Sequence, residues 1–117
     1  MTDVQHARFR IDEVIHAPVR FSIVAALAQA DEAEFAAVRD AVQVSDSVLS
    51  KQVTILEAAG YVVVKKGYVG KRPRTWLRLS ETGAAALQEH LAALRAIADG
   101  RPLGSGSVSA AAGNAPA

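Results

Sequence analysis

Short polar and basic side chains gather on one face of the segment SDSVLSKQVTILEAAG, which begins at Ser45. Leu49, Val53 and Leu56 recur at a four-then-three spacing, which predicts an amphipathic helix with these side chains toward the core. The opposite face lacks the Glu and Lys pairs of an ordinary surface helix, so a partner has room to approach closely. Such a face suits a helix in the major groove of DNA, where hydroxyl, amide and ammonium groups bond base edges. The residues expected to contact DNA from this helix are Ser45, Ser47, Ser50, Lys51, Gln52 and Thr54.

Basic side chains dominate the segment that follows. The formal net charge of +1 conceals this, because residues 45–78 hold seven basic and two acidic residues, whereas the remainder holds six basic and ten acidic ones. From Lys65 to Arg78 there are six basic residues and no acidic one. Lysine and arginine at this density neutralise phosphates and release counterions, which gives affinity for DNA without sequence information. The residues expected to contact the DNA backbone are Lys65, Lys66, Lys71, Arg72 and Arg74.

Two segments rich in β-branched and aromatic residues, YVVVKKG and RTWLRLS, must position these basic side chains. They are separated by a loop that contains Gly67, Gly70 and Pro73, so the pattern predicts a two-stranded hairpin. In the second strand Leu77 and Leu79 share one face, because side chains alternate along a strand. We expect these leucines to face the core.

Three helices are expected ahead of these elements. A loose apolar stripe predicts the first over about residues 5–16. A proline, which suits the first turn of a helix, opens the second over residues 18–30, which is apolar nearly all round and therefore expected to be the buried central helix. A short third helix is expected over residues 31–42, because the helix dipole favours acidic residues at the start of a helix. The helix with the polar face should follow a cap at Ser45 or Ser47.

The last expected helix follows a cap at Ser80 and carries leucines at a four-then-three spacing. This spacing is typical of a coiled-coil-like seam, and such a seam exposed on a monomer would invite association with a second copy. We therefore expect a homodimer held by the first and last helices. The predicted interface residues are Phe9, Leu87, Leu91 and Leu94.

One domain is expected over residues 1–98, since the chain has 117 residues and half of them are apolar. Its fold class is predicted to be mainly α with a small β-hairpin, that is, α+β. Residues 99–117 are mostly Gly, Ser, Ala and Pro, with almost no large apolar side chain to offset the entropy of ordering. They are predicted to form a disordered tail.

Several classes of function are disfavoured by what the sequence lacks. Without cysteine there is no disulfide, thiolate metal site or cysteine nucleophile. His6 and His16 lie at opposite ends of the first expected helix and His90 lies in the last one, so no metal and no cofactor is expected. Neither a Gly-rich phosphate loop nor a nucleophile elbow is found, which argues against an enzyme. An apolar stretch of about twenty residues and a signal peptide are also lacking, so a cytoplasmic protein without a membrane partner is expected.

The chain resembles the winged helix-turn-helix DNA-binding domains of the ArsR and MarR type of bacterial transcriptional regulators. The resemblance rests on HAPVRFSIVAAL, SDSVLSKQVTILEAAGYV and KKGYVGKRPRTWLRLSETG, and it spans about residues 9–98. It implies a homodimer with two recognition helices in successive major grooves and a basic wing on the backbone or minor groove. Lys51 and Gln52 stand where the family often has arginine and histidine. By position, the resemblance assigns Ser47, Ser50, Lys51 and Thr54 to bases or adjacent phosphates, and Lys71, Arg72 and Arg74 to the wing.

Two other functions stay open at this stage. Some proteins of this type are metal-responsive repressors, but here a site would have to be assembled across subunits from histidines and carboxylates. A winged helix that binds an acidic protein partner would also suit the basic segment. A sequence-specific transcriptional regulator, acting as a repressor on double-stranded DNA, is the leading hypothesis. The residues do not distinguish a repressor from an activator, and they do not identify an operator or a small-molecule effector.

Overall fold

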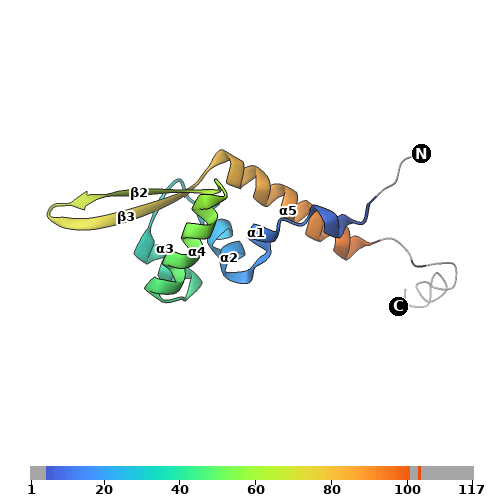
Figure 1. Cartoon of the computed structure of the whole chain (residues 1–117), viewed down its shortest axis with the longest axis horizontal. Coiled ribbons are helices and arrows are strands. Elements are labelled where there is room, and N and C mark those ends of the chain that lie inside the picture. Colours follow the sequence, from blue (N-terminus) through green and yellow to red (C-terminus); the bar gives the residue numbers. More distant parts are fainter. Residues whose placement is uncertain (1–4, 101–102, 104–117) are drawn as a thin grey trace.

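Five α-helices and a three-stranded antiparallel sheet make up the part of the chain that the computed structural model describes, residues 5–100 and 103. The predicted α+β fold with a small hairpin and a long C-terminal helix is confirmed. The hairpin projects from one end of the molecule, and α5 leads away toward the other (Figure 1). In chain order the elements are the 3-10 helix η1 (Ala7–Arg10), α1 (Glu13–His16), α2 (Pro18–Leu27), β1 (Ala33–Glu34), α3 (Phe35–Val42), α4 (Asp46–Ala58), β2 (Val62–Val69), β3 (Arg72–Leu79) and α5 (Glu81–Asp99).

The prediction of one continuous helix over residues 5–16 is wrong, because this segment forms two separate short helices. The backbone is extended at Ile11 and Asp12, which separate η1 from α1. The carboxylate of Asp12 accepts hydrogen bonds from the amides of Val14 and Ile15, at 2.9 and 3.2 Å, and so caps a new helix. A short acidic side chain that bonds the backbone locally competes with helix continuation, which explains the break.

The central helix is α2, as predicted. It begins with proline at its first position, where the missing amide proton has no helical partner to lose. Ile23, Val24 and Leu27 are buried and join the core with residues of every other helix. The helix ends at Leu27, three residues earlier than expected.

The acidic start predicted for the third helix is not helical, and its last two residues, Ala33 and Glu34, form the short strand β1. Ala33 pairs with Leu77 and Glu34 with Trp76, so β1 lies on the side of β3 away from β2. Helix α3 begins after it and has no acidic residue in its first turn. The helix-dipole argument is therefore wrong here, because pairing with a distant strand outweighs a dipole contribution of about 0.3–1 kcal/mol.

The hairpin is longer than predicted. Gly67 and Pro73 lie within the strands rather than in a loop, and the chain turns at Gly70, whose φ is 64°. Proline is tolerated at this point because β1 covers only the other end of β3 and leaves an edge beside it. Gly67 serves packing, since an added Cβ would lie 3.2 Å from the Trp76 ring across the ladder. The prediction that Leu77 faces the core is confirmed, because its side chain is fully buried.

Helix α5 begins after Ser80, whose hydroxyl accepts from the amide of Gly83 at 2.9 Å, as predicted. The leucines of the predicted seam do not all face the same way, because Leu87 turns into the core whereas Leu91 is exposed. Leu87 is only 4% exposed and belongs to the chain's own core, with His90 and Ala93 along the same stripe. The predicted disordered tail lies outside the described residues, apart from 99, 100 and 103.

Candidate nucleic-acid interface

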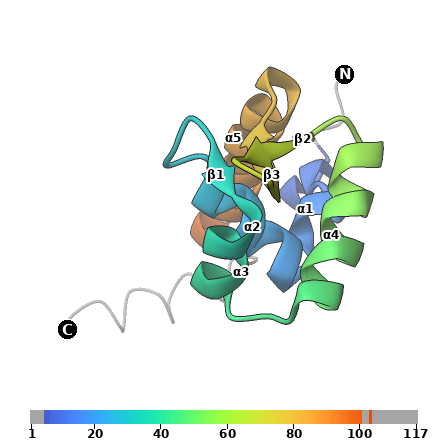
Figure 2. The same ribbon diagram turned by 90° about the vertical axis from the view of Figure 1, so that its left-hand side faces the viewer.

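Helix α4 presents the polar face that the sequence predicts. Leu49, Val53 and Leu56 are buried, and Ser45 caps the helix by accepting from the amide of Val48 at 3.2 Å. Viewed along the hairpin, α4 runs at the margin of the molecule (Figure 2). Its exposed polar residues are Ser47, Ser50, Lys51 and Thr54, together with the acidic Asp46 and Glu57 near its two ends.

Gln52 departs from the predicted set. Its side chain is half-buried, and its amide oxygen accepts from Nη1 of Arg20 at 2.8 Å. The same guanidinium donates from Nε to the carbonyl of Val14 at 2.6 Å, so Arg20 joins α4 to α1. Gln52 therefore joins α4 to Arg20 of α2.

Two apolar side chains on α4 were not among the predicted site residues. Val48 is 39% exposed and Ile55 is 38% exposed. They are seven residues apart, two helical turns, and so flank the polar face on one side. The sequence could have predicted their exposure, because apolar residues outside the stripe of Leu49, Val53 and Leu56 do not face the core of the domain.

Two ion pairs of Arg39 stabilise the turn that leads into the first turn of α4. The chain leaves α3 through Gln43, which has a left-handed backbone with φ 59°. Arg39 then reaches Asp40 at 2.9 Å and Asp46 at 2.8 Å. The two carboxylates raise the pKa of Arg39 above its already high value. The turn between the helices is thus held from both sides, and α4 starts in a defined direction.

The basic residues of the hairpin divide between its two faces. Lys66 pairs with Thr75 on the face that Val64 and Leu77 turn toward α4. Residues directly opposite in an antiparallel ladder share a face, so the other basic positions lie on the opposite side. That outer face carries Lys65, Arg72, Arg74 and Arg78, with Trp76 among them.

Two of the predicted wing residues already have acidic partners. Arg74 donates from Nη1 to Glu34 of β1 at 2.7 Å, and its side chain is 36% exposed. Lys65 lies 3.6 Å from Glu32 and 5.3 Å from the centre of the Trp76 ring. Arg74 therefore fastens β3 to β1. Among the described residues, no salt bridge involves Lys66, Lys71 or Arg72.

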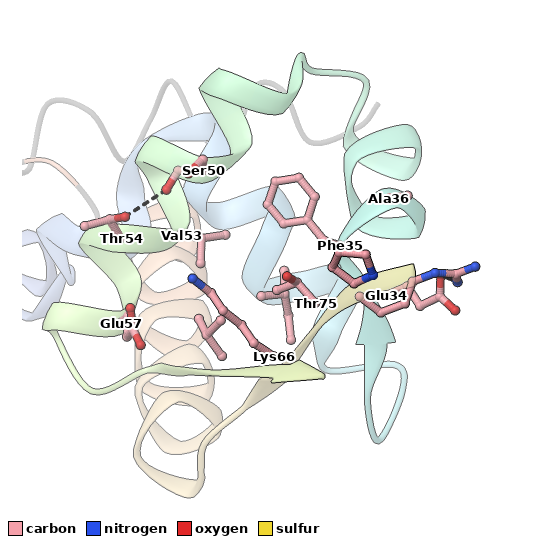
Figure 3. A pocket seen from close by; sticks show the side chains of 13 residues that line it. Glu34, Phe35, Ala36, Ser50, Val53, Thr54, Glu57, Lys66 and Thr75 are labelled. Carbon is pink, nitrogen blue, oxygen red and sulfur yellow. Dashed lines mark hydrogen bonds and ion pairs between the residues drawn. The ribbon is translucent and has the colours of Figure 1, made fainter. Parts of the chain in front are cut away.

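An open hollow of about 910 Å³ separates α4 from the hairpin (Figure 3). Its apolar lining includes Phe35, Val53, Val64 and Leu77, and Ser50 and Thr54 stand along its helical rim. Thr54 donates its hydroxyl proton to the carbonyl of Ser50 at 2.9 Å. Lys66 extends across the hollow toward α4 (Figure 3). The structure thus brings one predicted wing residue next to two predicted helix residues.

The predicted dimer residues separate into two groups. Phe9 is 59% exposed and Leu91 is 39% exposed, and their elements η1 and α5 pack against each other. Leu94 is half-buried. Leu87 is removed from the predicted interface because its side chain is enclosed in its own domain.

The comparison with known proteins agrees with this geometry. A family model described as a winged helix DNA-binding domain matches residues 19–98. The chain belongs to this family. A search of curated sequences found no significant match.

Solved structures with the same fold are transcriptional regulators. One is a transcriptional regulator homologue from Pyrococcus horikoshii OT3, with 26% identity and a TM-score of 0.71 over 79% of this chain and 91% of that one. A MarR family regulator from Silicibacter pomeroyi has 20% identity and a TM-score of 0.59, over 80% and 62%. Bordetella bronchiseptica BpsR, whose DNA binding is regulated by 6-hydroxynicotinic acid, has 16% identity and a TM-score of 0.63, over 92% and 84%. These proteins share the winged helix fold of this chain.

Within residues 5–100, no group of three or more His, Asp or Glu side chains is arranged to hold a metal ion. In the same part of the chain, no helix combines the length and apolar character needed to cross a membrane.

Proposed function

We propose that this winged helix protein is a sequence-specific DNA-binding transcriptional regulator that acts as a homodimer. Helix α4 enters the major groove, and the hairpin lies on the backbone or in the minor groove. The observation that carries the proposal is the hollow where Ser50 and Thr54 of α4 face Lys66 of the hairpin. Because a protein bound to an operator can block transcription by occupying the DNA, we propose that this protein acts as a repressor. We do not propose an enzymatic activity. Selecting bound fragments from the source genome tests this by naming the operator.

The base-reading part of the proposal rests on the exposed side chains of α4. Ser47, Lys51 and Thr54 supply hydrogen-bonding groups short or flexible enough for the backbone to approach base edges. Val48 and Ile55 suit the thymine methyl, which is the apolar group that the major groove displays. We leave Gln52 out of this set because Arg20 already bonds its amide oxygen.

The backbone-binding part rests on the hairpin residues without acidic partners. Lys66 stands at the hollow, and Lys71 and Arg72 stand at the tip beside the turn at Gly70. Each free cation placed on a phosphate releases a counterion and adds affinity that does not depend on sequence. Arg74 is given a supporting role, because Glu34 already neutralises it.

Dimerisation is proposed through Phe9 and Leu91, with Leu94 at their margin. An aromatic ring that is 59% exposed next to an exposed leucine forms an apolar surface that a second copy would cover. Two-fold pairing would also place two copies of α4 on successive half-sites, which is how winged helix dimers match DNA periodicity.

A rival function, docking of an acidic protein, would use the same basic hairpin. The two functions differ in whether binding depends on DNA sequence. A hairpin that docks an acidic protein recognises negative charge alone, so it would bind all DNA fragments alike. A gel shift across a salt series with genomic fragments, beside a pull-down from lysate, separates them. Retention of acidic proteins without any fragment preference would favour the rival.

Changing Arg72 to Ala should weaken binding to all DNA sequences alike. Losing one phosphate contact flattens the log–log salt dependence by about 0.9, or about 1.8 for a two-fold dimer. Arg74 to Ala is the matched comparison, and it should leave most of the salt slope unchanged because Glu34 already neutralises that guanidinium. Fluorescence anisotropy across a salt series measures both. Equal slope changes for the two variants would contradict the separate roles.

Changing Lys51 or Ser47 to Ala should instead reduce preference for the operator. Each base contact removed should cost about 1–3 kcal/mol on the operator, with little change on scrambled DNA. Gln88 to Ala, an exposed change on α5, is the control and should alter neither. The readout is anisotropy on operator and scrambled duplexes. A uniform loss on both duplexes would assign these residues to the backbone instead.

A further inference from the structure

His90 is the only polar side chain that is fully buried among the described residues. It lies on α5 and faces α1 and α2, with the rings of His16 and Phe21 edge-on at 5.3 and 5.2 Å. Its Nδ1 accepts from the backbone amide of Asp12 at 3.1 Å. Its Nε2 has no hydrogen-bond partner within the described part of the chain. Such a group is costly to bury, so its position calls for a physical account.

The contact with Asp12 determines where the ring carries its proton. Since Nδ1 accepts a hydrogen bond, the neutral ring holds its hydrogen on Nε2. A second proton must therefore be added at Nδ1, where it would point at another donor, the Asp12 amide. Protonation and the Asp12 contact exclude each other.

The surroundings of His90 also oppose its charge. Burial lowers the pKa of His90, and so does the neighbouring His16 of α1. The negative charges of Asp12 and Glu13 act in the opposite direction but are smaller effects. From α2 the ring meets Phe21, which carries no charge. The neutral ring is thus the form that fits the folded protein.

Asp12 connects this contact to the rest of the molecule. Its carboxylate caps α1, and its Oδ2 accepts from the hydroxyl of Tyr61 at 2.5 Å. Bonding to that carboxylate raises the pKa of Tyr61 to about 12, so the hydroxyl remains a donor across neutral pH. The carbonyl of Val14 in α1 accepts from Arg20, which also bonds Gln52 of α4. Helix α1 therefore spans from α5 to α4.

We propose that His90 and Asp12 form an acid-sensitive latch, in which proton uptake by His90 releases α1 from α5. The released segment includes η1, which carries Phe9 of the proposed dimer surface. Release would also loosen the Arg20 contact with α4. Acid would then weaken both the pairing of copies and the seating of α4, a regulation that rests on the proposed function, whereas the latch itself does not.

The sign of the pH effect follows from the direction of the shift. The unfolded chain takes up a proton at an ordinary histidine pKa, about 6.5, whereas the folded chain takes it up at lower pH. The unfolded state therefore binds more protons in between. The contribution to stability is fully present above about pH 6.5 and is lost as pH falls through the folded pKa.

Denaturant unfolding between pH 8 and pH 5 tests the latch without DNA. In the wild type, the unfolding constant should rise below about pH 6.5, by at most about tenfold per pH unit for one proton. His90→Asn keeps an acceptor near the Nδ1 position but cannot titrate, so this rise should flatten by up to that factor. His6→Asn, an exposed change outside the His90 cluster, is the matched control and should keep it. Equal pH dependence in wild type and His90→Asn would overturn the proposal.

A second measurement needs no variant and so covers the case in which His90→Asn fails to fold. Nitrogen NMR of the wild type should show the Nε2–H ring at neutral pH and a His90 midpoint below the ordinary value. Exchange of the Asp12 amide with solvent should accelerate as the ring titrates. A His90 midpoint at or above the ordinary histidine pKa would rule the latch out. So would an exchange rate of the Asp12 amide that does not change as His90 takes up its proton. Neither result bears on whether the protein binds DNA.

Discussion

Replacing both Phe9 and Leu91 by aspartate should convert dimers into monomers and lower affinity for an operator with two half-sites by about 10²–10⁴-fold. Both side chains are exposed in one chain, so the fold should tolerate the change. In the proposed dimer the new carboxylates would be buried against apolar surface without partners, which is costly. With pairing lost, the second half-site no longer benefits from the local concentration that the first provides.

Light scattering at micromolar concentration and anisotropy on one and two half-sites measure the two effects separately. Ala85→Asp places one carboxylate at an exposed position of α5 further from Leu91 and should leave the dimer intact. Leu87→Asp is not a suitable test, because that side chain lies in the core and its loss would unfold the domain. A wild-type protein that is monomeric under these conditions would show the interface to be wrong.

Replacing Gly83 by alanine should destabilise the protein by about 1–3 kcal/mol or more, the usual range for overpacking. An added Cβ would lie 2.3 Å from the carbonyl oxygen of Tyr61 and 2.8 Å from Cδ1 of Leu79. That carbonyl already accepts from the amide of Ser80 at 2.9 Å, so it cannot move away freely. The clash falls where the base of the hairpin meets α5. Strain there would also change the angle between the wing and the proposed dimer helix.

The sign of this effect is diagnostic, because alanine inside a helix is normally favoured over glycine by about 1 kcal/mol. Ala85→Gly, at an exposed position two residues further along α5, is the matched comparison and should cost that ordinary amount. Both are measured as a shift in the midpoint of denaturant unfolding with an unchanged slope. A Gly83→Ala protein as stable as the wild type would mean that α5 and the hairpin do not approach so closely.

The sequence by itself determined the elements whose signals are local. The spacing of Leu49, Val53 and Leu56 predicted the buried side of α4, and with it the exposed polar side. Ser45 and Ser80 predicted two helix starts, since a hydroxyl caps an amide only two or three residues away. Alternation along β3 likewise oriented Leu77. These features depend on chain periodicity and on neighbours within one turn, which is the range that a sequence pattern reports.

Only the tertiary structure decided which polar groups are free and which are occupied. Arg74 and Gln52 have the composition of DNA contacts, but their partners Glu34 and Arg20 lie 40 and 32 residues away in the chain. His90 meets Asp12 across 78 residues. The rotation of α5 that turns Leu87 inward depends on the helices and strand packed beside it. Periodicity gives no information on such long-range pairing, because any helix with two apolar stripes satisfies the same pattern until its neighbours cover one of them.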